Sequence, residues 1–327
     1  MLKTFMTFDQ ILGHDRQKDI LSRALANGRL AHAYLFSGPD GVGKRLMALA
    51  LARAIVCLEQ RGCGHCLACR KIDHQNHPDL HILEPDGNSI KIEQIRAFQR
   101  ELNLKPLEAP RKICLIEQAE SMTAGAANAL LKTLEEPRGD TLLMLLSAQP
   151  NRLLETIRSR CQPLPFARHP NSRIQAELEK RLGIESTESH VLAALSEGSF
   201  KKAFGKDREL YLGQRRELLK TLTGLSSGSI LPILDFAEQL AADKTILPDI
   251  LEIFQAFYRD VLMTLQGRSD EELVNLDLKD KIRRVSGRES VTSILAKLDA
   301  LIEVRRQLDR NVNRQLAMEV LLLKLAA

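Results

Sequence analysis

The sequence has no tryptophan, and aromatic residues make up only 4% of its 327 positions. A core must therefore come mostly from leucine, isoleucine, valine and alanine, a balance typical of helix-rich proteins. No apolar run approaches the roughly 18 residues that a membrane-spanning helix needs, and the candidate at residues 142–146 is the size of a strand. The first residues also lack the apolar core and cleavage site of a signal peptide. We therefore expect a cytoplasmic protein without membrane contact.

A large excess of charge is also missing, because 47 basic and 42 acidic residues leave a formal net charge of +5. A surplus of this size fits a soluble surface of mixed charge and does not by itself indicate nucleic-acid binding. The composition is 44% hydrophobic and 27% charged, which excludes intrinsic disorder. The chain is too long for one ordinary domain and suggests two or three.

Short apolar runs alternate with helical patterns in the first half of the chain. Strands are predicted at residues 33–36, 80–83, 112–116 and 141–146, and helices at about 45–56, 92–102 and 124–134. Strands that alternate with helices predict an α/β domain, in which a parallel sheet carries helices on both faces.

The strand signals stop after residue 166, and the remainder has helical periodicity. Two or three short helices are predicted over 170–204, helices throughout 208–327, and one periodic segment over 291–325. We therefore predict an α/β domain at 1–167, a small helical domain at 168–207 and an all-α domain at 208–327.

A glycine-rich turn follows the first predicted strand and opens a helix. It reads Gly38-Pro-Asp-Gly41-Val-Gly43-Lys44, which is the Walker A spacing in its usual context. Glycines let backbone N–H groups turn toward a phosphate, and the lysine meets the phosphate oxygens. The pattern predicts descent from a phosphate-binding loop.

Two departures argue against ATP hydrolysis at this loop. Arg45 stands where a serine or threonine would bind Mg²⁺, and a guanidinium cannot coordinate a cation. Glu117-Gln118 stands at the end of the third strand, where a working site carries Asp-Glu, and an amide has no useful basicity. Weak nucleotide binding, with ATP and Mg²⁺ weak or absent, and a purely architectural turn both remain open.

Four cysteines are concentrated in thirteen residues, at Cys57, Cys63, Cys66 and Cys69. Two CxxC steps in a reducing compartment predict a closed tetrahedral zinc site with a structural role. Whether Cys57 or a nearby histidine is the fourth ligand stays open, the candidates being His65, His74 and His77.

Several further stretches resemble the clamp-loader AAA+ subunits of bacterial DNA polymerase III. They are residues 8–14, residues 32–36, the four-cysteine insertion, Asn-Ala-Leu-Leu-Lys-Thr-Leu-Glu-Glu-Pro at 128–137, and the Ser-Arg-Cys motif at 159–161. The resemblance extends over the whole chain, is densest over residues 7–166, and favours the delta prime branch over the ATP-hydrolysing gamma/tau branch. It implies an AAA+ module, then a small helical lid and a helical collar for oligomerisation.

The resemblance also implies roles for individual residues. Ser147 occupies the sensor-1 position, and Lys201 the sensor-2 position, where active subunits carry an arginine. Arg160 of the Ser-Arg-Cys motif corresponds to an arginine finger that reaches the ATP of a neighbouring subunit, with Arg158 as the competing candidate. A permanently charged, planar guanidinium suits that task.

The expected function is that of a clamp-loader subunit with no independent ATPase activity. The resemblance implies gamma/tau and delta subunits as partners, with the sliding clamp and primed DNA reached through the complex of the polymerase holoenzyme. The main alternative is an active ATPase of the gamma/tau type, and Arg45 and Gln118 argue against it. A zinc-stabilised AAA+ protein outside replication is a third possibility.

Overall fold

The computed structural model describes residues 7–136, 140–205, 209–226, 228–310 and 312–327. The chain forms two compact units, Met1–His169 and Pro170–Ala327. None of the helices in the described ranges has the length and apolar character of a membrane span.

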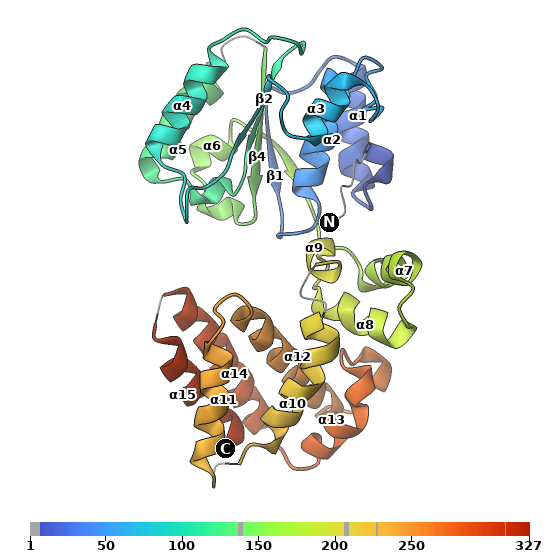
Figure 1. Ribbon diagram of the computed structural model, residues 1–327, viewed down its shortest axis with the longest axis vertical. Helices are drawn as coiled ribbons and strands as arrows, with labels where there is room; N and C mark the ends of the chain where they lie inside the picture. Colours follow the sequence, from blue (N-terminus) through green and yellow to red (C-terminus); the bar gives the residue numbers. More distant parts are fainter. Residues whose placement is uncertain (1–6, 137–139, 206–208, 227, 311) are drawn as a thin grey trace. The chain divides into compact units, whose positions relative to one another are not determined.

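A five-stranded parallel sheet forms the centre of the first unit (Figure 1). Its strands are β1 (Ala33–Ser37), β2 (Leu80–Leu83), β3 (Lys112–Ile116), β4 (Thr141–Ser147) and β5 (Gln162–Pro165), in the spatial order β2-β3-β4-β1-β5. Because all its neighbouring strands are parallel, each connection must cross over the sheet, and the crossovers carry the helices.

Helices cover both faces of this sheet. On one face lie α1 (Asp15–Ala26), α2 (Lys44–Val56) and α3 (Leu67–Asp73), and on the other α4 (Ile92–Leu102), α5 (Ala124–Glu135) and α6 (Glu155–Arg158), as Figure 1 shows. Successive strand residues point to opposite faces, so Phe36 and Met144 join the first layer and Leu35 and Leu143 the second. The predicted α/β fold class is confirmed.

The predicted strands and helices of this unit agree closely with those observed, but β5 was not predicted. Pro163 and Pro165 both lie within it, and proline cannot donate to a sheet's hydrogen bonds. The strand tolerates them because it lies at the edge of the sheet, beside β1. Three 3-10 turns complete the unit: η1 (Phe8–Gln10), η2 (Ala119–Ser121) and η3 (Pro150–Arg152).

The carboxyl ends of the parallel strands gather the predicted motifs at one edge of the sheet. The glycine-rich loop follows β1, Glu117 follows β3, and Ser147 ends β4, which lies between them. Open α/β sheets place their ligand sites at this edge.

The regular elements in the described residues of the second unit are all helical. It contains α7 (Asn171–Leu182), α8 (Ser186–Leu195), α9 (Phe200–Ala203), α10 (Arg215–Gly224), α11 (Ile230–Ala241), α12 (Leu247–Leu265), α13 (Lys279–Ser286), α14 (Val291–Asp309) and α15 (Arg314–Ala326), with shorter turns at η4 (Leu210–Gln214), η5 (Asp270–Glu272) and η6 (Leu276–Leu278). One hydrophobic core runs from Ile174 to Leu325. The boundary predicted at 207/208 lies outside the described residues, and the division into lid and collar stays a prediction.

The segment predicted as one periodic stretch, 291–325, is two helices. α14 ends at Asp309 and α15 begins at Arg314. Asn313 caps α15, because its side-chain oxygen accepts the N–H of Leu316 at 3.2 Å. The apolar spacing continues across the break, so periodicity alone did not reveal it.

Gly38 lies so close to the backbone of Phe166 that a side chain at this position should destabilise the protein. A Cβ on Gly38 would lie 2.1 Å from the carbonyl oxygen of Phe166, and the φ of Gly38 is +148°. We expect Gly38→Ala to lower the free energy of unfolding by roughly 2–4 kcal/mol, since backbone must move. Chemical denaturation followed by circular dichroism measures this.

Gly28→Ala is the matched control, because Gly28 also has a positive φ, +62°, but a Cβ there meets nothing within 4 Å. Its cost should be limited to the left-handed backbone, about 1–2 kcal/mol. Equal losses in the two variants would contradict the role assigned to the contact with Phe166.

Candidate functional site

The glycine-rich loop is a tight turn fixed to the neighbouring strand. The N–H of Gly38 donates to the carbonyl of Ser147 at 3.1 Å, which joins the loop to the end of β4. Gly41 and Gly43 have φ values of +75° and +111°, conformations that residues with a Cβ rarely adopt. The three glycines are therefore used as the Walker A pattern predicts, with α2 beginning at Lys44.

Lys44 is buried and its ammonium group is held by the loop itself. Nζ donates to the carbonyl of Pro39 at 2.7 Å and to that of Gly38, and lies 3.6 Å from Oδ1 of Asp40. Burial lowers the pKa of Lys44, while the carboxylate of Asp40 acts in the opposite direction. A phosphate entering the loop would have to replace these contacts.

Two histidines hold the same loop: His14, which ends the family-like segment 8–14, and His169, which the sequence analysis did not assign to the site. The carbonyl of Val42 is 2.8 Å from Nε2 of His14 and 3.0 Å from Nε2 of His169. The two rings lie 4.6 Å apart, and that of His14 also packs edge-on against Phe166. Burial lowers the pKa of His14, so the neutral imidazole is favoured at this carbonyl.

Arg45 points to the carboxyl ends of β2 and β3. Its Nε lies 2.5 Å from Oε1 of Glu117, and its Nη2 is 3.3 Å from Oε1 of Glu84 and 3.2 Å from Oε1 of Gln75. Glu117, which stands where a working site carries a metal-binding aspartate, is thus paired with a guanidinium. Glu84 and Gln75 had not been singled out, although Glu84 directly follows a strand and so could have been expected at this edge.

The remaining predicted nucleotide residues lie around this edge or in the second unit. Gln118 is exposed and has a φ of +47° at the start of η2. Ser147 is fully buried at the end of β4, and its Oγ accepts the N–H of Gln149 at 3.2 Å. Glu120, which the sequence analysis missed, accepts the N–H of Ala148 at 2.9 Å. Lys201 is exposed on α9 of the second unit.

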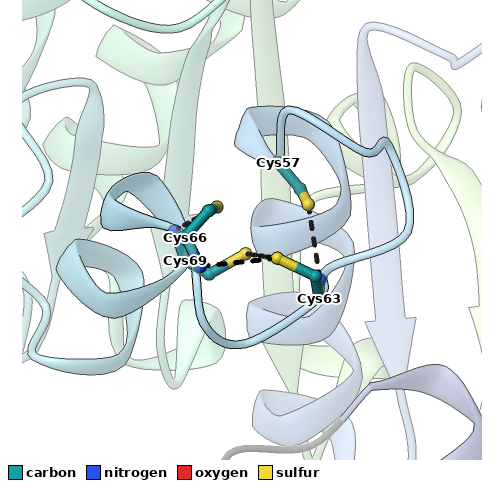
Figure 2. Close-up of side chains that lie close together, drawn as sticks. All are labelled: Cys57, Cys63, Cys66 and Cys69. Atoms are coloured by element: carbon teal, nitrogen blue, oxygen red, sulfur yellow. Dashed lines mark hydrogen bonds between the residues drawn. The ribbon is translucent and has the colours of Figure 1, made fainter.

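The four cysteines converge after the end of α2 (Figure 2). Their sulfur atoms all lie within 4.8 Å of one another, and Sγ of Cys63 and Cys69 are 3.9 Å apart. Sulfurs that bind one zinc ion at about 2.3 Å are about 3.8 Å apart in a tetrahedron. The cluster therefore has the donors and spacing to hold a metal ion, and Cys57, which directly follows α2, is part of it.

Backbone N–H groups point at these sulfurs. Those of Cys63, Cys66 and Cys69 approach Sγ of Cys57, Cys63 and Cys66 at 3.3, 3.5 and 3.4 Å. Burial acts to raise the pKa of Cys57, but the N–H groups directed at its sulfur outweigh burial and leave the pKa at about 6. A thiolate, the form that binds metal, is therefore favoured at Cys57, whereas burial raises the pKa of Cys63 and of Cys69.

The histidines considered as a fourth metal ligand in place of Cys57 make other contacts. Nδ1 of buried His77 accepts the N–H of Asp79 at 3.1 Å. His65 is exposed and contacts Glu59 at 3.1 Å, although with Glu59 and Cys63 it forms a second group of close donor atoms. His74 is exposed after α3. The geometry favours four cysteines.

An ion pair between two buried side chains joins α2 to the cysteine module, by which we mean residues 57–73, the four cysteines together with α3. Arg53 of α2 contacts Asp73 at the end of α3, and the two side chains are 5% and 2% exposed. Gln75, two residues beyond Asp73, accepts from Arg45. The module is therefore connected both to α2, which begins at the glycine-rich loop, and to Arg45.

The Ser-Arg-Cys motif follows α6. Its cysteine lies in the core and its arginine at the surface. Cys161 is buried, and burial raises its pKa to about 12. Arg160 extends outward with 35% of its side chain exposed; Nη2 lies 2.6 Å from Oε1 of Glu135, and Nη1 donates to the carbonyl of Thr156 at 3.0 Å. The neighbouring candidate, Arg158, is exposed. Pro137, which ends the other signature stretch, lies outside the described residues.

Comparison with known families agrees with the arrangement of both units. The family described as DNA polymerase III, delta subunit matches residues 13–170, and that described as DNA polymerase III, delta subunit, C terminal matches residues 210–327.

Individual relatives give the same result at full length. The chain is 36% identical to DNA polymerase III subunit delta′ of Bacillus subtilis, with 95% of each chain covered. It is 33% identical to subunit delta′ of Pseudomonas aeruginosa over 95% of this chain and 96% of the relative. Subunit tau of Bacillus subtilis is 30% identical, but the similarity covers 60% of this chain and 36% of tau.

The buried pair of Arg53 and Asp73 gives a prediction for this region. We expect Asp73→Asn to lower the free energy of unfolding by about 3–5 kcal/mol, because it leaves a buried guanidinium without a counter-charge. The double variant Arg53→Met/Asp73→Leu, which removes both charges, should lose less. Urea titration of the three proteins tests this, and a double variant less stable than Asp73→Asn would refute it.

Proposed function

Because the chain belongs to the delta prime subunits of DNA polymerase III, we propose that it serves as a clamp-loader subunit that activates ATP hydrolysis in a neighbouring subunit. In this proposal its own loop does not hydrolyse ATP. The observation that carries it is the contrast between the partners of two arginines: Arg45 pairs with Glu117 and Glu84 at the edge of its own sheet, where a metal ion would bind, whereas Arg160 pairs with Glu135 away from that edge.

The contacts of Arg45 support an inactive site. Hydrolysis needs a cation that bridges the phosphates and is held by hydroxyl and carboxylate oxygens. The guanidinium lies 2.5 Å from Glu117, and a Mg²⁺ ion brought to the same carboxylate would meet a fixed positive charge. Both ions cannot occupy that position, so we infer that magnesium-dependent binding of ATP is weak or absent.

The residues that would activate water or hold phosphate support the same conclusion. Gln118 is an amide and cannot accept a proton from the attacking water. Lys44 donates to the carbonyls of its own loop, so phosphate binding must first break these contacts. We infer that the loop is retained chiefly as the turn between β1 and α2.

Arg160 has the chemistry and the exposure that an arginine finger requires. Its backbone is fixed by the buried neighbours Ile157 and Cys161, while its guanidinium is at the surface. A guanidinium placed on the γ-phosphate of a neighbour's ATP would neutralise charge that develops during phosphoryl transfer. This assignment is carried over from the Ser-Arg-Cys motif of the family.

The proposed partners are the gamma/tau and delta subunits, and the complex would place the sliding clamp on primed DNA. A row of exposed apolar side chains on α15 supports assembly through the second unit. Leu316, Val320 and Leu323, at helical spacing, are 56%, 45% and 41% exposed, more than a solvated helix face needs. We infer that part of this row is covered by neighbouring subunits.

We further propose that the cysteine cluster holds one structural zinc ion. Cys57, Cys63, Cys66 and Cys69 supply four sulfur donors and leave no position for water or substrate. When bound, the ion would fix the loop between α2 and α3, which the few apolar contacts of such a short insertion cannot do alone.

The finger assignment predicts a kinetic effect. In a complex reconstituted with gamma/tau and delta subunits, we expect Arg160→Ala to slow single-turnover hydrolysis at the neighbouring site by about 10³-fold. Arg160→Lys should recover little of this rate, since an ammonium lacks the planar fork. Rapid-quench measurement with primed DNA and clamp gives the rate.

Arg158→Ala is the control for this experiment, because it removes the same charge two residues away. A full rate with Arg160→Ala, or an equal loss with Arg158→Ala, would contradict the assignment. The isolated chain should hydrolyse no ATP above background, whereas turnover like that of a gamma/tau subunit would favour the alternative function.

The zinc proposal predicts a defined metal content. Elemental analysis should find about one zinc ion per chain, and Cys66→Ser should lose it together with the thermal stability of the first unit. Cys114→Ala, which alters a buried strand cysteine outside the cluster, should keep the metal. Equal zinc content in the two variants would be evidence against the cluster.

A further inference from the structure

We propose that Glu135 is a positioning residue that holds the Arg160 guanidinium on its own chain until the phosphate of a neighbour's nucleotide displaces it. This inference rests on the proposed role of Arg160 as an arginine finger. It assigns to the last residue of α5 a role in regulating when that finger is available.

The geometry is a defined contact between the two most distinctive motifs of the chain. Oε1 of Glu135 lies 2.6 Å from Nη2 of Arg160, and Nη1 of the same guanidinium donates to the carbonyl of Thr156 at 3.0 Å. The two terminal nitrogens of the guanidinium are thus held by a carboxylate and by a backbone oxygen, and each of these would compete with a phosphate for the arginine.

The backbones that carry the pair are fixed by a shared core. Leu130 and Leu134 of α5 are buried with Ile157 and Cys161 in the layer beneath the sheet face. The charged ends, in contrast, are open to solvent, with side-chain exposures of 49% for Glu135 and 35% for Arg160. The contact can therefore open by side-chain rotation without repacking the core.

The strength expected for such a pair fits a reversible contact. Ion pairs at exposed positions contribute little, because water solvates both partners and salt screens them. A phosphate carries more negative charge and can accept two hydrogen bonds from one guanidinium. It should therefore displace Glu135, and a carboxylate that stayed beside the phosphate would repel it.

This competition predicts a specific effect of removing the carboxylate. In the reconstituted complex we expect Glu135→Gln to lower the KM for ATP of the DNA-stimulated reaction by about two- to five-fold, the range of an exposed ion pair, with kcat changed less than about two-fold. The difference should shrink as salt rises from about 0.05 to 0.3 M, because screening weakens the pair in the wild type.

Glu136→Gln is the matched control, since Glu136 is the adjacent exposed acid and the charge change is identical. Its KM should equal that of the wild type. Thermal melts of the isolated chains should coincide, because the pair is exposed and the core beneath it is unchanged.

Combining the variants separates this inference from the proposed function. Glu135→Gln should have no effect in the Arg160→Ala background, since nothing remains for Glu135 to hold. If Arg160→Ala leaves hydrolysis intact, the finger assignment itself fails. If Arg160→Ala slows hydrolysis but Glu135→Gln leaves the KM unchanged or raises it, the finger stands and the role of Glu135 is overturned.

Discussion

The contact between Nε of Arg45 and Oε1 of Glu117, 2.5 Å long, joins the first turn of α2 to the end of β3. In a working site a hydroxyl and a carboxylate would bind the metal ion; here Arg45 stands in place of the hydroxyl, and its guanidinium forms an ion pair with the carboxylate. The parallel sheet makes this possible, because its strands end at one edge and bring the residues that follow them together. The chemistry of the loop follows from this pairing.

The two arginines differ in the number and origin of their acidic partners. Arg45 contacts Glu117 and Glu84, which follow two different strands of the sheet. Among the described residues, Arg160 contacts one carboxylate, that of Glu135 at the carboxyl end of α5. Displacing the first guanidinium would leave two glutamates without their cation, while displacing the second leaves one exposed glutamate. The physical cost of release therefore favours Arg160 as the cation that can be shared with another chain.

The sequence predicted those features that depend on local pattern. Four strands, the helices between them and the four-cysteine cluster all follow from periodicity or spacing, and the structure contains them. Strand β5 was not predicted because Pro163 and Pro165 are typical of a loop. Proline is tolerated in a strand at the edge of a sheet, but the sequence of one segment does not show that the segment lies at an edge. The pairing of Glu135 with Arg160 was not predicted because the tertiary fold brings the end of α5 to the turn after α6, and no local pattern links residues 25 positions apart.

The cysteine module has a structural consequence that reaches the loop. Its sulfurs fix the start of α3, the pair of Arg53 and Asp73 fixes the end of that helix against α2, and the chain then turns at Gln75, whose φ is +55°. Gln75 in turn accepts from Arg45 at 3.2 Å. The cysteine cluster and the guanidinium of Arg45 are therefore linked through α3, the buried pair of Arg53 and Asp73, and the exposed hydrogen bond from Arg45 to Gln75. We interpret the insertion as a support that stabilises the position of Arg45. Both ends of α3 are held against α2, the helix whose first two residues are Lys44 and Arg45.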